Sequence, residues 1–228
     1  MTTTTKRPVR IANCSGAISD PGGHMYNQAK YGPVDVITGD YLAQVNLAEH
    51  AEAAVQQSLE PLDEKRVKVV INGGALNAKG LAERTVELIQ QKGLNMTVAY
   101  VDGDNLTFRA AEILSSIKNG SVQHLNSAND AVRLEKDTLS FLGCPDEMPI
   151  VTANAYLGYR AIKRGLDEDA DIIICGCVAD ASQSLVLQRG AHEDPMVLDL
   201  EPRERTSTDS FGFYPAILEK LLGIVFIA

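Results

Sequence analysis

The sequence predicts an α/β fold in which a mostly parallel sheet of about six strands lies between helices on both faces, a Rossmann-like three-layer arrangement. Two observations lead to this prediction. Short apolar runs rich in β-branched residues alternate along the chain with longer amphipathic segments. One of the runs, VKVVIN at 67–72, is nearly continuously apolar, as expected for a strand that is covered on both faces.

The first part of the chain contains two predicted strands and one predicted helix. VRIANC at 9–14 forms the first strand, and Asp-Pro-Gly-Gly at 20–23 has the composition of a turn. VDVIT at 34–38 forms the second strand. Apolar residues then recur at helical spacing from 41 to about 59, and Pro61 marks the end of that helix.

The middle of the chain repeats the alternation. The strand at 67–72 leads through GGALNAKG into the helix LAERTVELIQQ at 81–91, which Gly93 ends. MTVAYV at 96–101 predicts the fourth strand. A helix is expected over about 107–117, and the order strand, helix, strand is typical of parallel sheets.

The next stretch is less regular. Ser-Ala-Asn-Asp at 127–130 has the form of a capping box and predicts a helix that Gly143 ends. IVTA at 150–153 and DIIICG at 171–176 predict two more strands, with a helix at 155–168 between them.

The alternation stops near residue 188. We therefore expect residues 1–187 to form the α/β domain, with 188–228 as a divergent tail that packs on the same domain or is irregular. No strand is predicted in this tail, and one helix is predicted at 215–222. An alternative is that the chain lacks the rest of a larger domain.

The charge balance argues against several partners. The 228 residues carry a net charge of −9, whereas nucleic-acid binding needs clustered Lys and Arg. An anionic membrane surface is disfavoured for the same reason, and no apolar run reaches the ~20 residues of a membrane span. The N-terminal MTTTTKRPVR has no hydrophobic signal region, so we expect a soluble, cytoplasmic protein.

Cysteine and histidine spacing gives little support for a metal centre. The four cysteines, Cys14, Cys144, Cys175 and Cys177, are too scattered for a disulfide scaffold. The last two lie in the apolar run IIICGC, which favours buried thiols over metal ligands. The four histidines show neither HxH nor HExxH spacing, so a zinc enzyme is not expected.

Polar residues follow almost every predicted strand. Ligands of open parallel sheets bind beyond the carboxyl ends of the strands, so these residues form the candidate site. In chain order they are Asn13, Ser15, Gly16, Asp40, Asn72, Gly73, Gly74, Asn77, Asp102, Asp104, Asn154, Tyr156, Asp180 and Ser182. The four acids among them suit a divalent cation or proton transfer, although each one alone is better explained as a solvated loop acid or a helix cap.

The segment Asn72–Gly80 supports two interpretations. Its glycines can direct backbone N–H groups at a phosphate or carboxylate at the start of a helix. The pattern is neither GxGxxG nor GxxxxGK(S/T), so no nucleotide fingerprint is present. The alternative is a tight turn in which Asn77 caps the helix, and the sequence favours neither.

The chain resembles the acyclic terpene utilisation (AtuA-like) family over about residues 9–187. The segments that carry the resemblance are RIANCSG at 10–16, VDVITGDYLA at 34–43, VVINGGALNAKGLAE at 69–83, NAYLG at 154–158 and DIIICGCVADAS at 171–182. The resemblance implies an α/β protein in the breakdown of branched or terpenoid acids as CoA thioesters. It implies a pathway more strongly than a reaction.

The leading hypothesis is therefore an enzyme that acts on a branched or terpenoid carboxylic acid or its CoA ester. The strand-end groups suit a lyase or hydratase reaction, and the acids among them suit a divalent metal. Asn72, Gly73, Gly74 and Asn77 would bind an anionic group. Asp40, Asp102 and Asp180 would supply acid–base or metal-binding carboxylates, while Asn154 and Tyr156 would orient the carbonyl. Asn13, Ser15, Gly16, Asp104 and Ser182 would add ligand contacts.

Three departures from the family pattern matter. Ala75 stands where the family has a glycine, and a positive φ there would strain the loop. Cys177 replaces an arginine, which removes an anion partner. The tail after 188 also diverges. The alternatives are therefore a non-catalytic subunit that works with a partner chain or as a homo-oligomer, and a degenerate, truncated family member.

Overall fold

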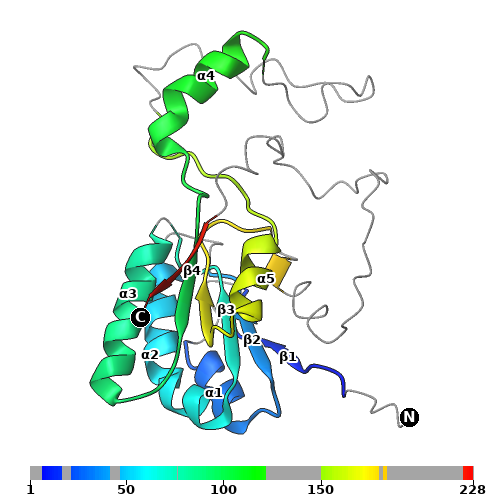
Figure 1. Cartoon of the computed structure of the whole chain (residues 1–228), viewed down its shortest axis with the longest axis vertical. Helices are drawn as coiled ribbons and strands as arrows, with labels where there is room; N and C mark the ends of the chain where they lie inside the picture. Colours follow the sequence, from blue (N-terminus) through cyan, green and yellow to red (C-terminus); the bar gives the residue numbers. More distant parts are fainter. Residues whose placement is uncertain are drawn as a thin grey trace. The chain divides into compact units, whose positions relative to one another are not determined.

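A computed structural model describes residues 7–16, 22–41, 47–75, 77–121, 150–179, 182–183 and 223–227. Figure 1 shows one sheet with helices on both of its faces. The strands are β1 (Ile11–Asn13), β2 (Val36–Gly39), β3 (Lys68–Ile71), β4 (Val98–Asp102), β5 (Ile172–Ile174) and β6 (Gly223–Ile227). The helices are α1 (His24–Tyr31), α2 (Leu47–Lys65), α3 (Ala78–Lys92), the 3-10 turn η1 (Thr107–Arg109), α4 (Ala110–Lys118) and α5 (Arg160–Asp167).

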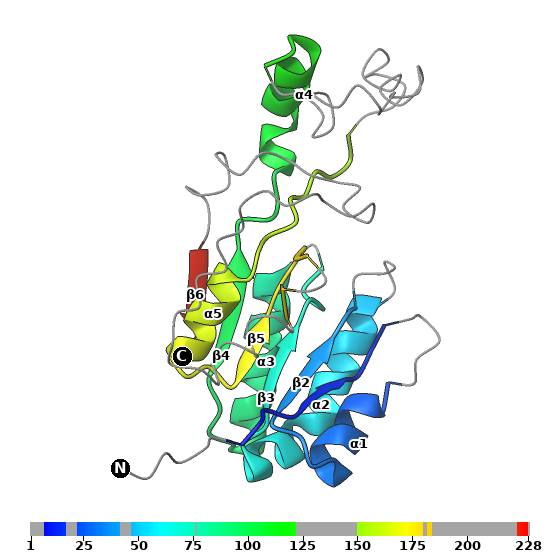
Figure 2. The ribbon, with the colours of Figure 1, turned by 90° about the vertical axis from the view of Figure 1, so that its right-hand side faces the viewer.

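The strand order is β1-β2-β3-β5-β4-β6, with five parallel strands and an antiparallel β6 paired to β4. Figure 2 shows β1 and β6 at the two edges. The predicted α/β class and mostly parallel sheet are therefore confirmed.

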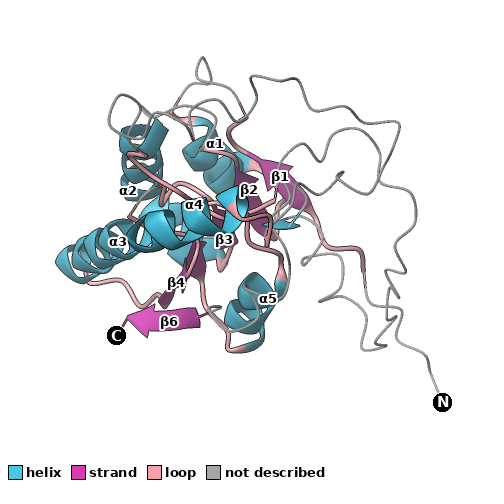
Figure 3. Ribbon diagram, turned by 90° about the horizontal axis from the view of Figure 1, so that it is seen from above, coloured by secondary structure: helices cyan, strands magenta, loops and turns pink. Residues whose placement is uncertain are grey.

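A change of direction in this order explains the two helical layers. The steps from β1 to β2, β3 and β4 run one way across the sheet, whereas the step from β4 to β5 runs back. Right-handed connections then place the earlier helices on one face and the helix of the return step on the other. Figure 3 shows this: α1, α2 and α3 lie on one side of the sheet and α5 on the opposite side.

Aliphatic side chains of the central strands form the core. Ile37, Val69, Ile71, Ile172 and Ile174 are completely buried, as parallel strands between two helical layers require. The helices contribute small and aliphatic residues to the same cluster, among them Met25, Ala29, Val55, Leu59 and Ala82.

The chain divides into two compact units. The first comprises Met1–Asp102, Leu157–Pro195 and Leu222–Ala228 and contains the whole sheet. The second comprises Gly103–Tyr156 and Met196–Leu221; its described part contains η1, α4 and an antiparallel bridge between Asn105 and Asn154. No helix of the described residues is long and apolar enough to cross a membrane.

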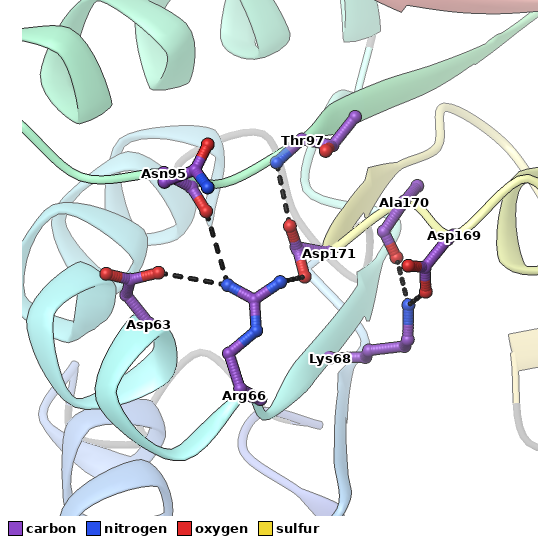
Figure 4. Close-up of polar contacts among 8 residues, drawn as sticks. All are labelled: Asp63, Arg66, Lys68, Asn95, Thr97, Asp169, Ala170 and Asp171. Carbon is purple, nitrogen blue, oxygen red and sulfur yellow. Dashed lines mark hydrogen bonds and ion pairs between the residues drawn. The ribbon is translucent and has the colours of Figure 1, made fainter.

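Charged side chains connect the starts of β3, β4 and β5 at the amino end of the sheet (Figure 4). The buried Asp171 carboxylate, just before β5, accepts hydrogen bonds from the Arg66 guanidinium at 2.8 Å and the Thr97 backbone N–H at 2.8 Å. Lys68 donates to the Asp169 carboxylate at 2.7 Å. These contacts hold the start of β5 between the starts of β3 and β4.

Two strand predictions were wrong. Residues 150–153 form no strand, and Val151 is 84% exposed, so this apolar run is not a core segment. The tail was expected to contain no strand, yet 223–227 forms β6. An antiparallel strand can join a sheet edge without the preceding helix that the alternation requires.

Helix boundaries also differ. The helix predicted at 41–59 is observed at Leu47–Lys65, and it continues through Pro61 because the completely buried Leu62 keeps the last turn against the core. The helix predicted at 155–168 begins only at Arg160, since Leu157 is instead bridged to Val178. Helix α1 was not predicted. The helices predicted at 127–142 and 215–222 lie outside the described residues.

Candidate functional site

Three adjacent strands bring Ser15, Asp40 and Asn72 together at the carboxyl end of the sheet. The Asn72 Nδ2 group donates to Asp40 Oδ1 at 2.7 Å. The Ser15 hydroxyl donates to the Asp40 backbone carbonyl at 3.2 Å, and the Asp40 N–H donates to the Ser15 carbonyl at 2.9 Å. Parallel pairing of β1, β2 and β3 places these ends side by side, so three predicted site residues form one connected group.

The Asn72 side chain is the buried centre of this group, with 2% of its surface exposed. Its Oδ1 accepts the Tyr41 backbone N–H at 2.6 Å, while its Nδ2 donates to Asp40. Asp40 itself is half-buried. A carboxylate held in this way at a strand end is a suitable group for proton transfer, which requires a fixed acceptor within hydrogen-bond reach of a substrate.

The sequence interpretation did not include Cys14 and Tyr41 in the site, although both support it. Both are buried, and the Tyr41 hydroxyl and Cys14 Sγ lie 3.4 Å apart. A Cβ atom on Gly39 would lie 2.7 Å from the Tyr41 ring and 2.9 Å from Cys14 Sγ. Gly39 therefore lets the Tyr41 ring pack against the end of β2, which positions the Tyr41 N–H for Asn72.

The loop after β3 has the hydrogen bonds of a tight turn. The Gly74 N–H donates to the Cys175 carbonyl at 3.0 Å, the Ala75 N–H to the Asn72 carbonyl at 3.3 Å, and the Asn77 N–H to the Gly74 carbonyl at 2.7 Å. The Asn77 side chain caps α3 by accepting the Gly80 N–H at 2.9 Å. Of the two interpretations of this segment, the capped turn accounts for these contacts, and an anion would need other donors.

Close packing explains the two glycines of this loop. A Cβ atom on Gly73 would lie 2.4 Å from the Ala51 Cβ of α2, and one on Gly74 would lie 2.5 Å from the Ala78 Cα of α3. Ala75 has a φ of 44°. The positive φ that was expected to strain this loop at Ala75 is thus present in the structure.

The segment after β5 reaches the same end of the sheet. Gly74 and Cys175 connect the loops after β3 and β5 at the carboxyl end of the strands, where ligands of open α/β sheets bind. Beyond Cys175, Ser182 and Gln183 are buried. With its amide oriented to satisfy its neighbours, Gln183 donates to the Val70 and Gly39 carbonyls at 2.9 and 3.2 Å. The sequence interpretation missed Gln183, and Asp180 lies outside the described residues.

The remaining candidates of the first unit are more peripheral. Asn13 and Gly16 are exposed at the end of β1, and Asp102 is exposed at the end of β4. Three strand spacings separate β2 from β4, a lateral distance of about 14 Å. Asp40 and Asp102 therefore cannot act on the same atom of a small ligand, although they can contact different parts of an extended one.

Three candidates belong to the second unit. The Ala155 N–H donates to the Asp104 carbonyl at 2.7 Å, next to the bridge between Asn105 and Asn154. Asp104 is buried, whereas Tyr156 is 54% exposed. The Asn154 Oδ1 atom is buried and finds no hydrogen-bond partner among the described residues, so this carbonyl oxygen would accept a donor from a ligand or a water molecule.

Metal binding has no structural support in the described ranges. Within them, no three His, Cys, Asp or Glu side chains lie close enough together to hold a metal ion. The described cysteines form no disulfide with one another. Cys14 and Cys175 are buried, whereas Cys177, which the sequence also predicts to be buried, is only partly so.

Comparison with known proteins gives one result. The model of the acyclic terpene utilisation family protein AtuA matches residues 9–192, which is more than half of the chain. Neither the curated proteins nor the solved structures contain a significant match. The matched range includes all of the candidate site residues.

Proposed function

Since this chain belongs to the acyclic terpene utilisation family AtuA, we propose that it is an enzyme acting on a branched or terpenoid carboxylic acid or its CoA ester. The reaction class that fits the site is that of a lyase or hydratase. Both reactions move a proton at a carbon next to a carbonyl group.

The single observation that carries this proposal is the group of Ser15, Asp40 and Asn72. It supplies one half-buried carboxylate, which a buried amide holds in place. This carboxylate lies at the carboxyl end of the strands, where open α/β folds bind ligands. Asp40 is the acid–base group in this proposal. A carboxylate positioned in this way typically contributes 10²–10⁴-fold to a rate.

The other candidates take supporting roles. An extended acyl chain would run across the strand ends from Asp40 towards Asp102, with Asn13, Gly16 and Ser182 as further contacts. Asp104, Asn154, Tyr156 and Asp180 stay proposed ligand contacts. Asn72, Gly73, Gly74 and Asn77 shape the loop that borders the ligand. Asn72 contacts Asp40 and Tyr41, the two glycines pack closely on α2 and α3, and Asn77 caps α3.

Ligand-dependent thermal stability tests the proposal. The purified chain is mixed with citronellic acid, citronellyl-CoA, octanoic acid, octanoyl-CoA or free coenzyme A, and its melting temperature is measured. A ligand at a hundredfold excess over its Kd stabilises the folded state by about 2.7 kcal/mol. We expect a clear rise with a branched ligand and a smaller one with its straight-chain counterpart.

Two variants locate the site. Asp40→Asn keeps the shape of the side chain and its acceptor oxygen for Asn72 but removes the charge, so the rise should shrink. Asp169→Asn makes the same charge change at the amino end of the sheet, on a side chain that is 89% exposed, and should leave the rise unchanged. An equal rise in all three proteins would place the ligand elsewhere, and no rise with any compound would remove the support for this function.

A second candidate function is a subunit that works with a partner chain or as a homo-oligomer. One observation favours it: Phe108 and Val151 of the second unit are 79% and 84% exposed, and exposed apolar side chains are typical of protein contacts. Light scattering of the wild type and of Phe108→Ser tests it. A monomeric wild type at all concentrations, with no partner recovered from its source cells, would contradict it.

A further inference from the structure

We propose that Gln183 positions the Ser182 hydroxyl as the hydrogen-bond donor for the acyl carbonyl oxygen of the ligand. Gln183 is the positioning residue in this inference, and Ser182 is the group that contacts the ligand. The role of Ser182 towards a ligand rests on the proposed function. The attachment of Gln183 to the sheet rests on the geometry of the protein alone, and it is tested without any compound.

The Gln183 side-chain amide bridges two neighbouring strands. One of its terminal atoms lies 2.9 Å from the Val70 carbonyl oxygen of β3 and 3.2 Å from the Gly39 carbonyl oxygen of β2. Carbonyl oxygens only accept hydrogen bonds, so this atom is the amide nitrogen, which has two protons to donate. The two neighbours thus determine the orientation of the amide, which is otherwise ambiguous for glutamine. Gln183 is 4% exposed, so both bonds are shielded from water.

These bonds bring the segment after β5 across the carboxyl end of the sheet. Strands β5 and β2 are not neighbours, because β3 lies between them. A side chain that follows β5 and bonds to Gly39 therefore reaches over the end of β3. Gly39 is the last residue of β2 and directly precedes Asp40. The Gln183 amide consequently fixes its own segment at the strand end that carries the proposed acid–base group.

Ser182 is held on both of its sides. Its backbone N–H donates to the Ala179 carbonyl at 2.7 Å, and the Ala179 N–H donates to the Leu157 carbonyl at 3.0 Å. On the other side follows Gln183, with its bonds to two strands. The backbone that carries the hydroxyl is thus fixed before a ligand binds, and such prior orientation is what makes a contact effective in a reaction.

The Ser182 hydroxyl has no protein partner among the residues that the structure describes, although Ser182 is only 6% exposed. Buried polar groups are nearly always hydrogen-bonded, so this hydroxyl calls for a water molecule or a ligand. Within the described ranges, Asn154 Oδ1 is the side-chain atom that is both fully enclosed and unpartnered. The Ser182 Oγ atom is not enclosed to that degree and is therefore accessible to a ligand.

A hydroxyl donor suits the chemistry of an acyl group. The carbonyl oxygen of an acid or thioester only accepts hydrogen bonds, and the nearby Gly74 N–H already donates to the Cys175 carbonyl at 3.0 Å. In the proposed reaction the C–H bond next to the carbonyl breaks, Asp40 takes the proton, and the electron pair moves towards the carbonyl oxygen. A fixed donor stabilises the charge that develops there, and Ser182 supplies it.

The first experiment tests the attachment of Gln183 in the wild type. Solvent exchange of its side-chain NH2 protons is measured by NMR, with the signals assigned by through-bond correlation to the Gln183 backbone. Both protons should exchange at least about tenfold more slowly than those of the exposed Gln57 in α2, because each is buried and donated to a carbonyl. Equal exchange rates would overturn the role of Gln183.

The second experiment tests the contact of Ser182 with the carbonyl oxygen. The probes are citronellyl-CoA and its thioether analogue, in which a methylene group replaces the acyl carbonyl. The ratio of their dissociation constants isolates the contribution of the oxygen, since the rest of the two molecules is the same. Wild type should prefer the thioester, and Ser182→Ala should reduce this preference about fivefold, as expected for one hydrogen bond. Ser182→Thr keeps the hydroxyl and should retain the preference.

Matched controls separate this contact from a general loss of stability. Ser58→Ala removes the hydroxyl of a completely buried serine that donates to the Ala54 carbonyl within α2 at 2.6 Å, and it should leave the ratio unchanged. Gln183→Met should lower the ratio, whereas Gln57→Met should not. An unchanged ratio in Gln183→Met would overturn the positioning role, and the amide exchange decides the matter should this variant fail to fold.

The outcomes distinguish this inference from the proposed function. If wild type binds the thioester but shows no preference for it, or if Ser182→Ala keeps the preference, the role of Ser182 is overturned while the proposed function stands. If wild type binds neither compound, the proposed function loses its support and the role of Ser182 is overturned with it. The amide exchange then still decides whether Gln183 joins the segment after β5 to β2 and β3.

Discussion

Arg66 and Asp171 form a 2.8 Å ion pair across 105 residues of sequence. Arg66 precedes β3 and Asp171 precedes β5, so the pair joins two strands that are neighbours in the sheet but distant in the chain (Figure 4). The Asp171 side chain is 8% exposed. The same carboxylate also accepts the Thr97 N–H before β4.

Removing this carboxylate should destabilise the fold. Asp171→Ala removes a buried carboxylate, leaves the Thr97 N–H without its acceptor and leaves Arg66 without its inner partner, and we expect a loss of about 2 kcal/mol in the free energy of unfolding. Urea denaturation measures it. Asp63→Ala, which removes the more exposed partner of the same Arg66 at 3.0 Å, serves as the control and should cost less than about 1 kcal/mol. Equal losses in both variants would contradict this explanation.

Relieving the strained loop residue should stabilise the protein. Ala75 adopts a φ of 44°, a region that costs an L-residue roughly 1–2 kcal/mol and a glycine almost nothing. Glycine also raises the conformational entropy of the unfolded chain, which offsets part of this gain. The net effect of Ala75→Gly should be a rise of about 0.5–1 kcal/mol in the free energy of unfolding. The matched substitution Ala53→Gly in α2 should instead lose about 1 kcal/mol. Differential scanning calorimetry of both variants tests the opposite signs.

Close packing at Gly73 should not tolerate a methyl group. The Cβ of Gly73→Ala would lie 2.4 Å from the Ala51 Cβ, so α2 or the loop must shift, at about 1–3 kcal/mol. Gly158→Ala, where a Cβ would meet nothing within 4 Å, provides the control. If the two variants melt at the same temperature, the contact between the loop and α2 is not tight in solution.

Low pH should reduce the free energy of unfolding through protonation of Asp35. Hydrogen bonds from the Arg7 guanidinium, and then from Arg10, hold the pKa of the Asp35 carboxyl well below its usual range. Because the folded-state pKa lies below the unfolded value of about 3.9, this contribution is fully present at neutral pH. It is lost as the pH falls below about 4 towards the folded-state pKa.

The variant Asp35→Asn checks this pH dependence. Arg7 and Arg10 are 65% and 49% exposed, so solvent screening limits the contribution to about 1 kcal/mol. The difference in unfolding free energy between wild type and variant should shrink when urea denaturation is repeated at pH 3 instead of pH 7. A difference that stays constant with pH would show that Asp35 is not titrating between the two states.

Much of the sheet was predictable because its signals are local. The runs at 9–14, 34–38, 67–72, 96–101 and 171–176 each overlap an observed parallel strand. Apolar β-branched runs between amphipathic segments indicate strands without reference to the rest of the chain. Ligands of open parallel sheets bind beyond the carboxyl ends of the strands, and this rule pointed to Ser15, Asp40 and Asn72 among the candidates. The residues that follow parallel strands all lie at the same end of the sheet.

Other features depend on contacts between distant segments. Strand β6 forms by antiparallel pairing with β4, and β5 inserts between β3 and β4; neither has a local signal. Cys14, Tyr41 and Gln183 support the site through partners that lie far away in the sequence. Cys14 and Tyr41 stand next to predicted site residues, but nothing in the sequence identifies the partners of their side chains and backbone.

The sequence by itself determined the α/β class, most of the parallel strands and the family, because these are encoded in hydrophobic periodicity and in short ordered motifs. Only the tertiary structure decided the strand order, the separation of Asp40 from Asp102, and the hydrogen bonds that join Asn72 to Asp40 and Tyr41. Those properties depend on the assembled sheet, because packing across the whole fold determines which strands and side chains become neighbours. Residues adjacent in the chain do not determine them.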